Sequence, residues 1–313
     1  MTTFLEDIPD TTQQTYTLLA GSVTDGEPIP VRDLIGYLSH SADAIRKLSL
    51  DLLEYRNDPV AIPALLKVAT DSAIEISVAA QEILRSFRHP QAIRHLIAGL
   101  YNINDDIRLA AIVALRERGA GEAIEGLVTA LGDPDARIRR EAVIALSRYG
   151  RADLILALRS ALRDESHSVR KAAVISMGGY DGAFVFDDLI VALSDPHWSV
   201  RKEAAAALAS FPVVDSVRAL TDSLNDPSWQ VVREAIIGLS RLRVPVDGAL
   251  LAQLSHEEPE VRVAVIGVLG EVSGPEALAD LDPLLNDESH RVRRAARRAF
   301  DKIAQRTPPA VEY

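Results

Sequence analysis

The chain has 313 residues, of which 48% are hydrophobic, 25% are charged and only 5% are aromatic. This balance excludes a disordered or fibrous protein, and it leaves Leu, Ile, Val and Ala to form the core. The formal charge of −11 argues against a protein that coats DNA or RNA, and the absence of cysteine excludes disulfides, zinc fingers, thiol nucleophiles and cysteine-held iron–sulfur clusters.

Residues 1–30 differ from the rest of the chain because they contain five acidic residues and no Lys or Arg. The segment lacks the basic and apolar regions of a signal peptide, and no run in the chain reaches the ~18 apolar residues that a membrane span needs. We therefore expect a cytoplasmic protein in which residues 1–30 form an acidic cap, with a helix at 11–20 and a loop at 21–30. The alternative is that this segment docks on a partner or folds back on the basic surface of the chain.

A repeat begins at residue 31 and continues to residue 306. In each of nine units, a β-branched residue is followed by Arg or its replacement, at steps of 31 residues with one step of 30. The Arg is replaced in two units, which carry Ile76-Ser77 and Val231-Val232. The other seven pairs are Ile45-Arg46, Ile107-Arg108, Ile138-Arg139, Val169-Arg170, Val200-Arg201, Val261-Arg262 and Val292-Arg293.

Other columns of the repeat define its local structure. Ala usually follows the Arg by three residues and Leu by seven, so that with the β-branched residue they form one apolar stripe of a helix. Asp or Asn usually stands six residues before the Arg, where a side-chain oxygen can accept N–H groups left free by a turn. A second amphipathic segment, such as 122–131, precedes this turn. Each unit is therefore a helical hairpin that must stack on its neighbours to bury its stripe.

These units resemble HEAT repeats, in particular the short type found in phycobilin lyases. Typical stretches are 133–146, DPDARIRREAVIAL, and 195–208, DPHWSVRKEAAAAL. The resemblance covers about residues 31–305 and implies a solenoid whose second helices line a concave face. We predict an all-α fold, a single right-handed α-solenoid of nine hairpins over residues 31–306, followed by a tail at 307–313. The fold does not decide the function, which depends on a site carried by it.

The Arg and Asp columns are expected to be structural. A guanidinium can bind an Asp or a loop carbonyl of its own or the next hairpin, and such a ladder would fix the stacking. Replacing one Arg should then cost stability rather than activity. The ladder is expected to contain Arg108, Arg139, Arg170, Arg201, Arg262 and Arg293, with Asp133, Asp164, Asp195 and Asp226.

The strongest candidate for a binding surface is a pair of columns on the second helices. Residues three before and one after the Arg position are four apart, so they lie one above the other on the helix. An exposed Trp often anchors an interface, although both indoles of this chain could instead staple neighbouring hairpins. Residues five after the Arg position are mostly aliphatic and are expected to lie outside the surface. The ring and cation pairs are His167 with Lys171, Trp198 with Lys202, and Trp229 with Arg233.

Two further residues belong to the predicted surface. Arg140 occupies the column of Lys171 in the preceding unit, and Tyr180 lies in the glycine-rich stretch 177–186 between two units. The basic groups favour a partner protein with an acidic surface or a ligand carboxylate. The last predicted helix is also basic, which suits the cap of a solenoid, and a grip on an acidic protein or a polyanion is the alternative.

No catalytic or metal-binding motif is recognised. Deoxyhypusine hydroxylases, which are also HEAT-like, need several His-Glu pairs to hold two irons, whereas this chain has only His256-Glu257. It has no Walker loop, dinucleotide fingerprint or nucleophile elbow. The phycobilin lyase resemblance implies one enzymatic alternative, in which Trp198 and Trp229 stack on a linear tetrapyrrole while the cations at 171, 202 and 233 face its propionates.

We therefore predict a non-catalytic scaffold, adaptor or assembly factor that binds another protein along its concave face. It is expected to be a monomer that uses no cofactor or metal and binds no nucleic acid or membrane. The acidic cap and the basic last helix leave weak head-to-tail association open. The alternative function is a phycobilin lyase or a subunit that delivers a chromophore or another cofactor.

Overall fold

The computed structural model describes residues 10–24, 28–87 and 89–306. Every regular element in these ranges is a helix, which confirms the predicted all-helical solenoid of stacked hairpins. The chain divides into two compact units, residues 1–150 and 151–313, and each is described by itself. The predicted boundaries of a cap, one solenoid and a tail stay a prediction, and residues 1–9 and 307–313 lie outside the described residues.

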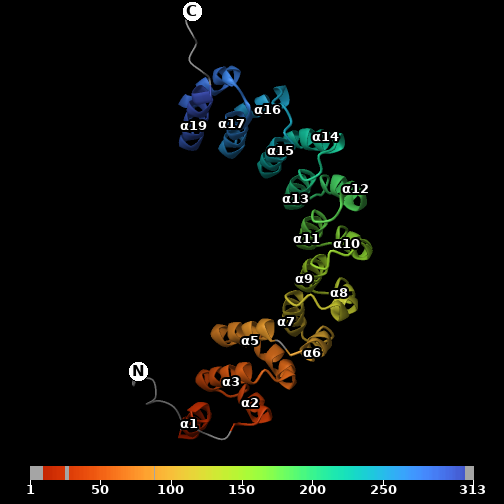
Figure 1. Ribbon diagram of the computed structural model, residues 1–313, viewed down its shortest axis with the longest axis vertical. Coiled ribbons are helices and arrows are strands. Elements are labelled where there is room, and N and C mark those ends of the chain that lie inside the picture. Colours follow the sequence, from red (N-terminus) through yellow and green to blue (C-terminus); the bar gives the residue numbers. More distant parts are fainter. Residues whose placement is uncertain (1–9, 25–27, 88, 307–313) are drawn as a thin grey trace, which may run out of the picture. The chain divides into compact units, whose positions relative to one another are not determined.

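The first unit contains one capping helix and four hairpins. Helix α1 (Asp10–Thr24) is longer than the expected 11–20 and packs against α3. In each hairpin we call the first helix A and the second helix B, and within each unit Figure 1 shows the A helices in one row and the B helices in another. The hairpins are α2 (Val31–Tyr37) with α3 (Asp43–Arg56), α4 (Ile62–Val68) with α5 (Ile74–Ser86), α6 (Ala92–Gly99) with α7 (Asp105–Arg116), and α8 (Ile124–Ala130) with α9 (Ala136–Ser147).

The second unit contains five hairpins of the same kind. Short 3₁₀ segments begin or end several of its A helices, as they do in the first unit. The hairpins are α10 (Ile155–Ala161) with α11 (His167–Met177), α12 (Gly182–Ala192) with α13 (Trp198–Leu208), α14 (Val214–Asp222) with α15 (Trp229–Arg241), α16 (Gly248–Ala252) with α17 (Pro259–Val272), and α18 (Leu278–Leu281) with α19 (His290–Arg306).

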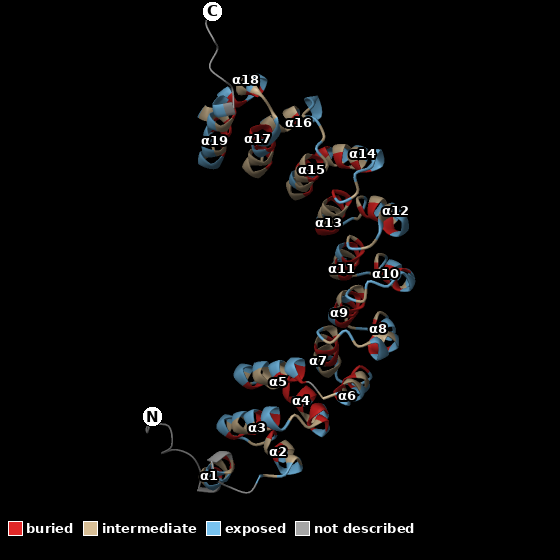
Figure 2. Cartoon of the chain, viewed as in Figure 1, coloured by how far each residue is buried: buried red, intermediate tan, exposed pale blue. Residues whose placement is uncertain are grey.

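The apolar stripe of the B helices forms the core of each unit. On α13, for example, Val200, Ala204 and Leu208 are all buried. The Ala column is buried in every hairpin, because a small side chain there lets the neighbouring helix approach closely. Figure 2 shows the buried residues where helices face one another and exposed residues on the outer surfaces. Stacking of identical stripes therefore buries what a single hairpin would leave in water.

Candidate functional site

The turn between helices A and B has the same geometry in all nine hairpins. The residue six before the Arg position accepts a hydrogen bond from the backbone N–H two residues later, as Asp195 does from His197 at 2.8 Å. Where this residue is His, in His40 and His256, the ring Nδ1 accepts the equivalent bond. The same bond is made at the remaining positions by Asp71, Asn102, Asp133, Asp164, Asp226 and Asp287.

The Arg column joins each turn to the next one. Arg201 donates from Nε and Nη2 to the two carboxylate oxygens of Asp226, at 2.7 and 2.8 Å, and from Nη1 to the carbonyls of Asp195 and Pro196 in its own turn. One guanidinium thus closes its own turn and holds the turn of the following hairpin. The same inter-turn ion pair, which we call a rung, joins Arg46 to Asp71, Arg108 to Asp133, Arg170 to Asp195 and Arg262 to Asp287.

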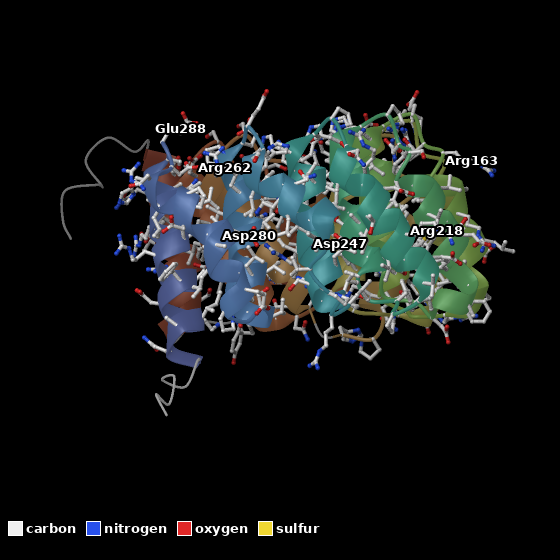
Figure 3. All side chains as sticks on the ribbon, turned by 90° about the horizontal axis from the view of Figure 1, so that it is seen from above. Arg163, Arg218, Asp247, Arg262, Asp280 and Glu288 are labelled. Atoms are coloured by element: carbon white, nitrogen blue, oxygen red, sulfur yellow. The ribbon has the colours of Figure 1, made fainter. Side chains whose placement is uncertain are left out.

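Arg139 and Arg293 also close their own turns through Nη1. Arg139 donates to the carbonyls of Asp133 and Pro134, and Arg293 donates to those of Asp287 and Glu288. Figure 3 shows Arg262 beside Glu288, a second acidic neighbour 3.7 Å away.

The rungs shift the pKa values of Asp195 and Arg201. The pKa of Asp195 is lowered, because burial, which alone would raise it, is outweighed by hydrogen bonds from Arg170 and from the His197 N–H. Hydrogen bonding to Asp226 likewise raises the pKa of Arg201. Both groups therefore stay ionised at neutral pH, as a structural ion pair requires, and neither is poised for proton transfer.

Two rungs are replaced, in different ways. Ser77 Oγ donates to the carbonyl of Ala69 at 2.7 Å, and the Gln81 amide donates to the same carbonyl at 3.2 Å. This carbonyl lies two residues before Asp71, so it is not one of the two that Nη1 of an Arg binds in the other turns. Val232 is buried and supplies no donor. The acceptor that would follow it is His256, whose imidazole supplies no carboxylate for a rung.

The predicted binding columns lie on the exposed side of α11, α13 and α15. The side chain of Trp198 is exposed and Trp229 is half-buried, so both rings reach the surface. Lys171 of α11 and Lys202 of α13 both pair with Glu203, at 3.6 and 3.2 Å. The two lysines therefore share one acid, which ties helix α11 to helix α13 across the surface.

Ring stacking on this surface involves a residue that the sequence did not single out. The ring of His167 stacks on that of His197 in the next hairpin, with centroids 3.8 Å apart and planes at 9°. His197 in turn stacks on Trp198 at 5.9 Å. His197 Nδ1 also caps α13 by accepting from the Ser199 N–H at 3.2 Å. The three rings form a continuous row from one hairpin to the next.

The aliphatic column five residues after the Arg position was expected to lie outside the surface, and this expectation is wrong for α11. Ile175 is 53% exposed, because it follows Lys171 by one helical turn on the same face. Ile237 of α15 is half-buried at the same position. We call the surface formed by His167, Lys171, Ile175, Trp198, Lys202, Glu203, Trp229, Arg233 and Ile237 the tryptophan face.

Two predicted residues are not assigned to the tryptophan face. Tyr180 follows the end of α11, and its hydroxyl is buried without a hydrogen-bond partner. Burial raises the pKa of Tyr180, with a smaller contribution from the charge of Asp153. The ring therefore packs into the end of its hairpin instead of extending a binding edge. Arg140 lies on α9 in the first unit, where it is exposed and pairs with Glu141 at 2.7 Å.

Protonation of His197 is expected to destabilise the second unit. Burial lowers the pKa of His197, and the adjacent His167 lowers it further. Because the unfolded chain then binds the proton more tightly, stability is full above the ordinary pKa of ~6.5 and falls as the pH drops toward the lowered folded value. His197→Ser keeps a capping oxygen and should reduce the loss of thermal midpoint between pH 7.5 and pH 5.5.

The matched control for this prediction is His290→Ser, which removes an exposed imidazole from the same position of α19 as His167 has in α11. It should leave the pH dependence as it is in the unchanged protein. An equal flattening of the curve by both variants would contradict the assignment to His197.

The repeat itself matches a family model. The model for HEAT repeats matches residues 31–116, 102–178, 155–241 and 248–313. The chain belongs to the HEAT-repeat family. No curated protein matches this HEAT-repeat chain.

Solved structures agree with this HEAT-repeat fold. Kap95p, which binds RanGDP, has a TM-score of 0.63 at 14% identity, over 96% of this chain and 48% of that one. Kap121p bound to Nup53p has a TM-score of 0.56 at 16% identity, over 96% of this chain and 42% of that one. At these identities the likeness shows the fold alone. This chain spans less than half the length of either.

In the described ranges, no group of three or more His, Asp and Glu side chains is placed to hold a metal ion. None of the helices described is long and apolar enough to cross a membrane. The tryptophan face offers rings, aliphatic side chains and paired charges, which together suit contact with another macromolecular surface.

Proposed function

We propose that this HEAT-repeat protein is a non-catalytic scaffold that binds another protein through the tryptophan face. The observation that supports this most is the indole of Trp198, which remains 40% exposed in the centre of the face. An aromatic ring with aliphatic neighbours and a rim of charges is the usual composition of an interface anchor. Lys171, Lys202 and Glu203 supply that rim.

The stacked row of His167, His197 and Trp198 supports the same proposal. A ring held by stacking loses little conformational freedom when a partner binds, so more of the contact energy appears as affinity. The Glu203 ion pairs hold the two lysines in a similar way. The face is therefore preorganised for a partner instead of being shaped by one.

The test is the double variant Trp198→Ala with Trp229→Ala. Loss of one indole should weaken binding by about 2 kcal/mol and loss of both by about 4 kcal/mol, so we expect the dissociation constant of the partner to rise roughly 1000-fold. The partner is captured from native extract, identified, expressed and titrated by calorimetry against both proteins. The helical melting midpoint should change little, because one ring is exposed and the other is half-buried.

A matched control removes two other exposed aliphatic side chains from the A helices of the same unit. Leu156→Ala with Val191→Ala should leave the affinity unchanged, since both residues lie on helices α10 and α12. A large fall in the melting midpoint of the tryptophan variant would instead mean that the indoles staple the stack. Equal weakening by both double variants would exclude the tryptophan face as the binding site.

We further propose that the repeats belong to the short type found in phycobilin lyases, on the support of their 31-residue step and Asp-Pro turns. The absence of cysteine fits a cytoplasmic location.

The same capture experiment examines the lyase alternative. A visible absorbance on mixing with a linear tetrapyrrole, followed by covalent transfer to a captured acceptor, would replace the scaffold proposal with that activity.

A further inference from the structure

The last helix carries a concentration of cations that its place in the fold does not require. Residues 290–306 contain seven Lys and Arg residues and one acid, Asp301, in a chain whose formal charge is −11. Three of the cations are bound within the unit. Arg293 donates to two carbonyls of its own turn, Arg291 pairs with Glu260, and Lys302 pairs with Glu271.

Three other cations have no acid. Arg294, Arg297 and Arg298 are exposed, and no ion pair joins them to an acidic side chain in the described part of the chain. They lie three and four residues apart on α19, so their guanidinium groups gather on adjoining parts of one helix surface and repel one another. The cations of the tryptophan face differ, because Lys171 and Lys202 share Glu203.

The position of Arg297 shows what the end of the stack does require. In the four preceding hairpins of the unit, the equivalent residues are aliphatic and are covered by the next hairpin: Val174, Ala205, Ile236 and Ile266. In the described residues no further hairpin covers α19, and Arg297 is exposed there. Uncharged polar residues, or acidic and basic residues in alternation, would also be soluble at this surface. Three unpaired arginines exceed what the end of the stack requires and weaken the helix unless a partner neutralises them.

We infer that this surface, which we call the arginine patch (Arg294, Arg297 and Arg298), binds an acidic segment of a partner protein. Guanidinium groups spaced three and four residues apart match carboxylates spaced in the same way on a second helix, and each can bind a carboxylate through two N–H groups. This inference concerns a surface separate from the tryptophan face and does not rest on that face binding a partner.

The charges around the arginine patch favour a short acidic segment over a long polyanion. The exposed acids Asp280, Asp282 and Glu288 lie in the same hairpin, and Figure 3 shows Asp280 and Glu288 among its side chains. A nucleic acid or an anionic bilayer would extend beyond three arginines and meet these acids. A peptide with a few carboxylates can bind the patch and end before them.

The experiment titrates the full chain into a fluorescein-labelled 15-residue helical peptide that carries Glu at every third and fourth position, with anisotropy as the readout. The variant is Arg294→Glu with Arg297→Glu and Arg298→Glu, and a second variant with Gln at the three positions removes the charges without reversing them. We expect binding that weakens as salt rises from 50 to 200 mM and at least a tenfold loss of affinity in both variants.

The matched control reverses three exposed arginines elsewhere, Arg94, Arg163 and Arg218, and so makes the same change in net charge. The affinity of this control for the peptide should fall less than threefold. The double tryptophan variant should bind the peptide like the unchanged protein. Three results would overturn the proposal. They are no binding of the peptide, an equal loss in the control, and tighter binding to a 15-nucleotide RNA or to phosphatidylserine vesicles than to the peptide.

Discussion

Replacing Arg201 with Ala is expected to lower the free energy of unfolding of the second unit by about 3 kcal/mol. The side chains of Arg201 and Asp226 are only 12% and 9% exposed, so the change leaves a nearly buried carboxylate without its two strongest hydrogen bonds. It also frees the carbonyls of Asp195 and Pro196. Hydrogen exchange of the amides of α13 and α15 should accelerate first, because a repeat array can open locally.

The control is Arg218→Ala on α14. Arg218 is exposed, as Figure 3 shows, and its ion pair with Asp215 is long, at 3.7 Å between two well-exposed side chains. Such a pair contributes little, so the unfolding free energy should change by less than ~0.5 kcal/mol. If the two variants had the same free energy of unfolding, the rungs would contribute no more to the stability of the stack than an exposed ion pair does.

Restoring the missing rung at Val232 should require two changes instead of one. Val232→Arg alone would place a cation in a buried position, with the carbonyls of Asp226 and Pro227 within reach but only His256 at the place of the next carboxylate. We expect it to lower the unfolding free energy by about 3 kcal/mol. His256→Asp would complete the pair and should return about 2 kcal/mol of that loss.

The measurement is a double-mutant cycle on the unfolding free energy, with His256→Asp as the second single variant. His256→Asp keeps the capping bond to the Glu258 N–H, because an Asp makes this bond in most other turns. A coupling energy near zero would mean that the one-residue deletion between these two hairpins has moved the turns out of register for a rung.

The fold could be predicted from the sequence because its signal is repeated nine times. Each column averages over nine hairpins, so single departures such as Ser77 and Val232 do not obscure the helix, the turn or the stripe. The turn geometry was also accessible, since a side-chain acceptor three residues before a helix start has few other uses. That His40 and His256 supply the same acceptor through Nδ1 became clear only from the structure.

The surface was less predictable, because it depends on how neighbouring hairpins lie against one another. Helical spacing places Trp198 and Ile175 on the outward side of their helices. The exposed fraction of each side chain also depends on the distance to the neighbouring helix, which the spacing of residues does not give. Aliphatic character suggested that Ile175 was covered, and the structure exposes it. The stacking of His167 on His197 joins different columns of two hairpins, so no single column could indicate it.

Each 31-residue segment carries one half of each of two different rungs. Asp195, for example, accepts from the hairpin before it, while Arg201, six residues later, donates to the hairpin after it. A tandem duplication of such a segment therefore carries an acceptor for its predecessor and a donor for its successor, and both new joints are complete at once. Growth of this protein by copying whole hairpins would have needed no compensating mutation at either junction, and the two missing rungs are losses that such an array can absorb afterwards.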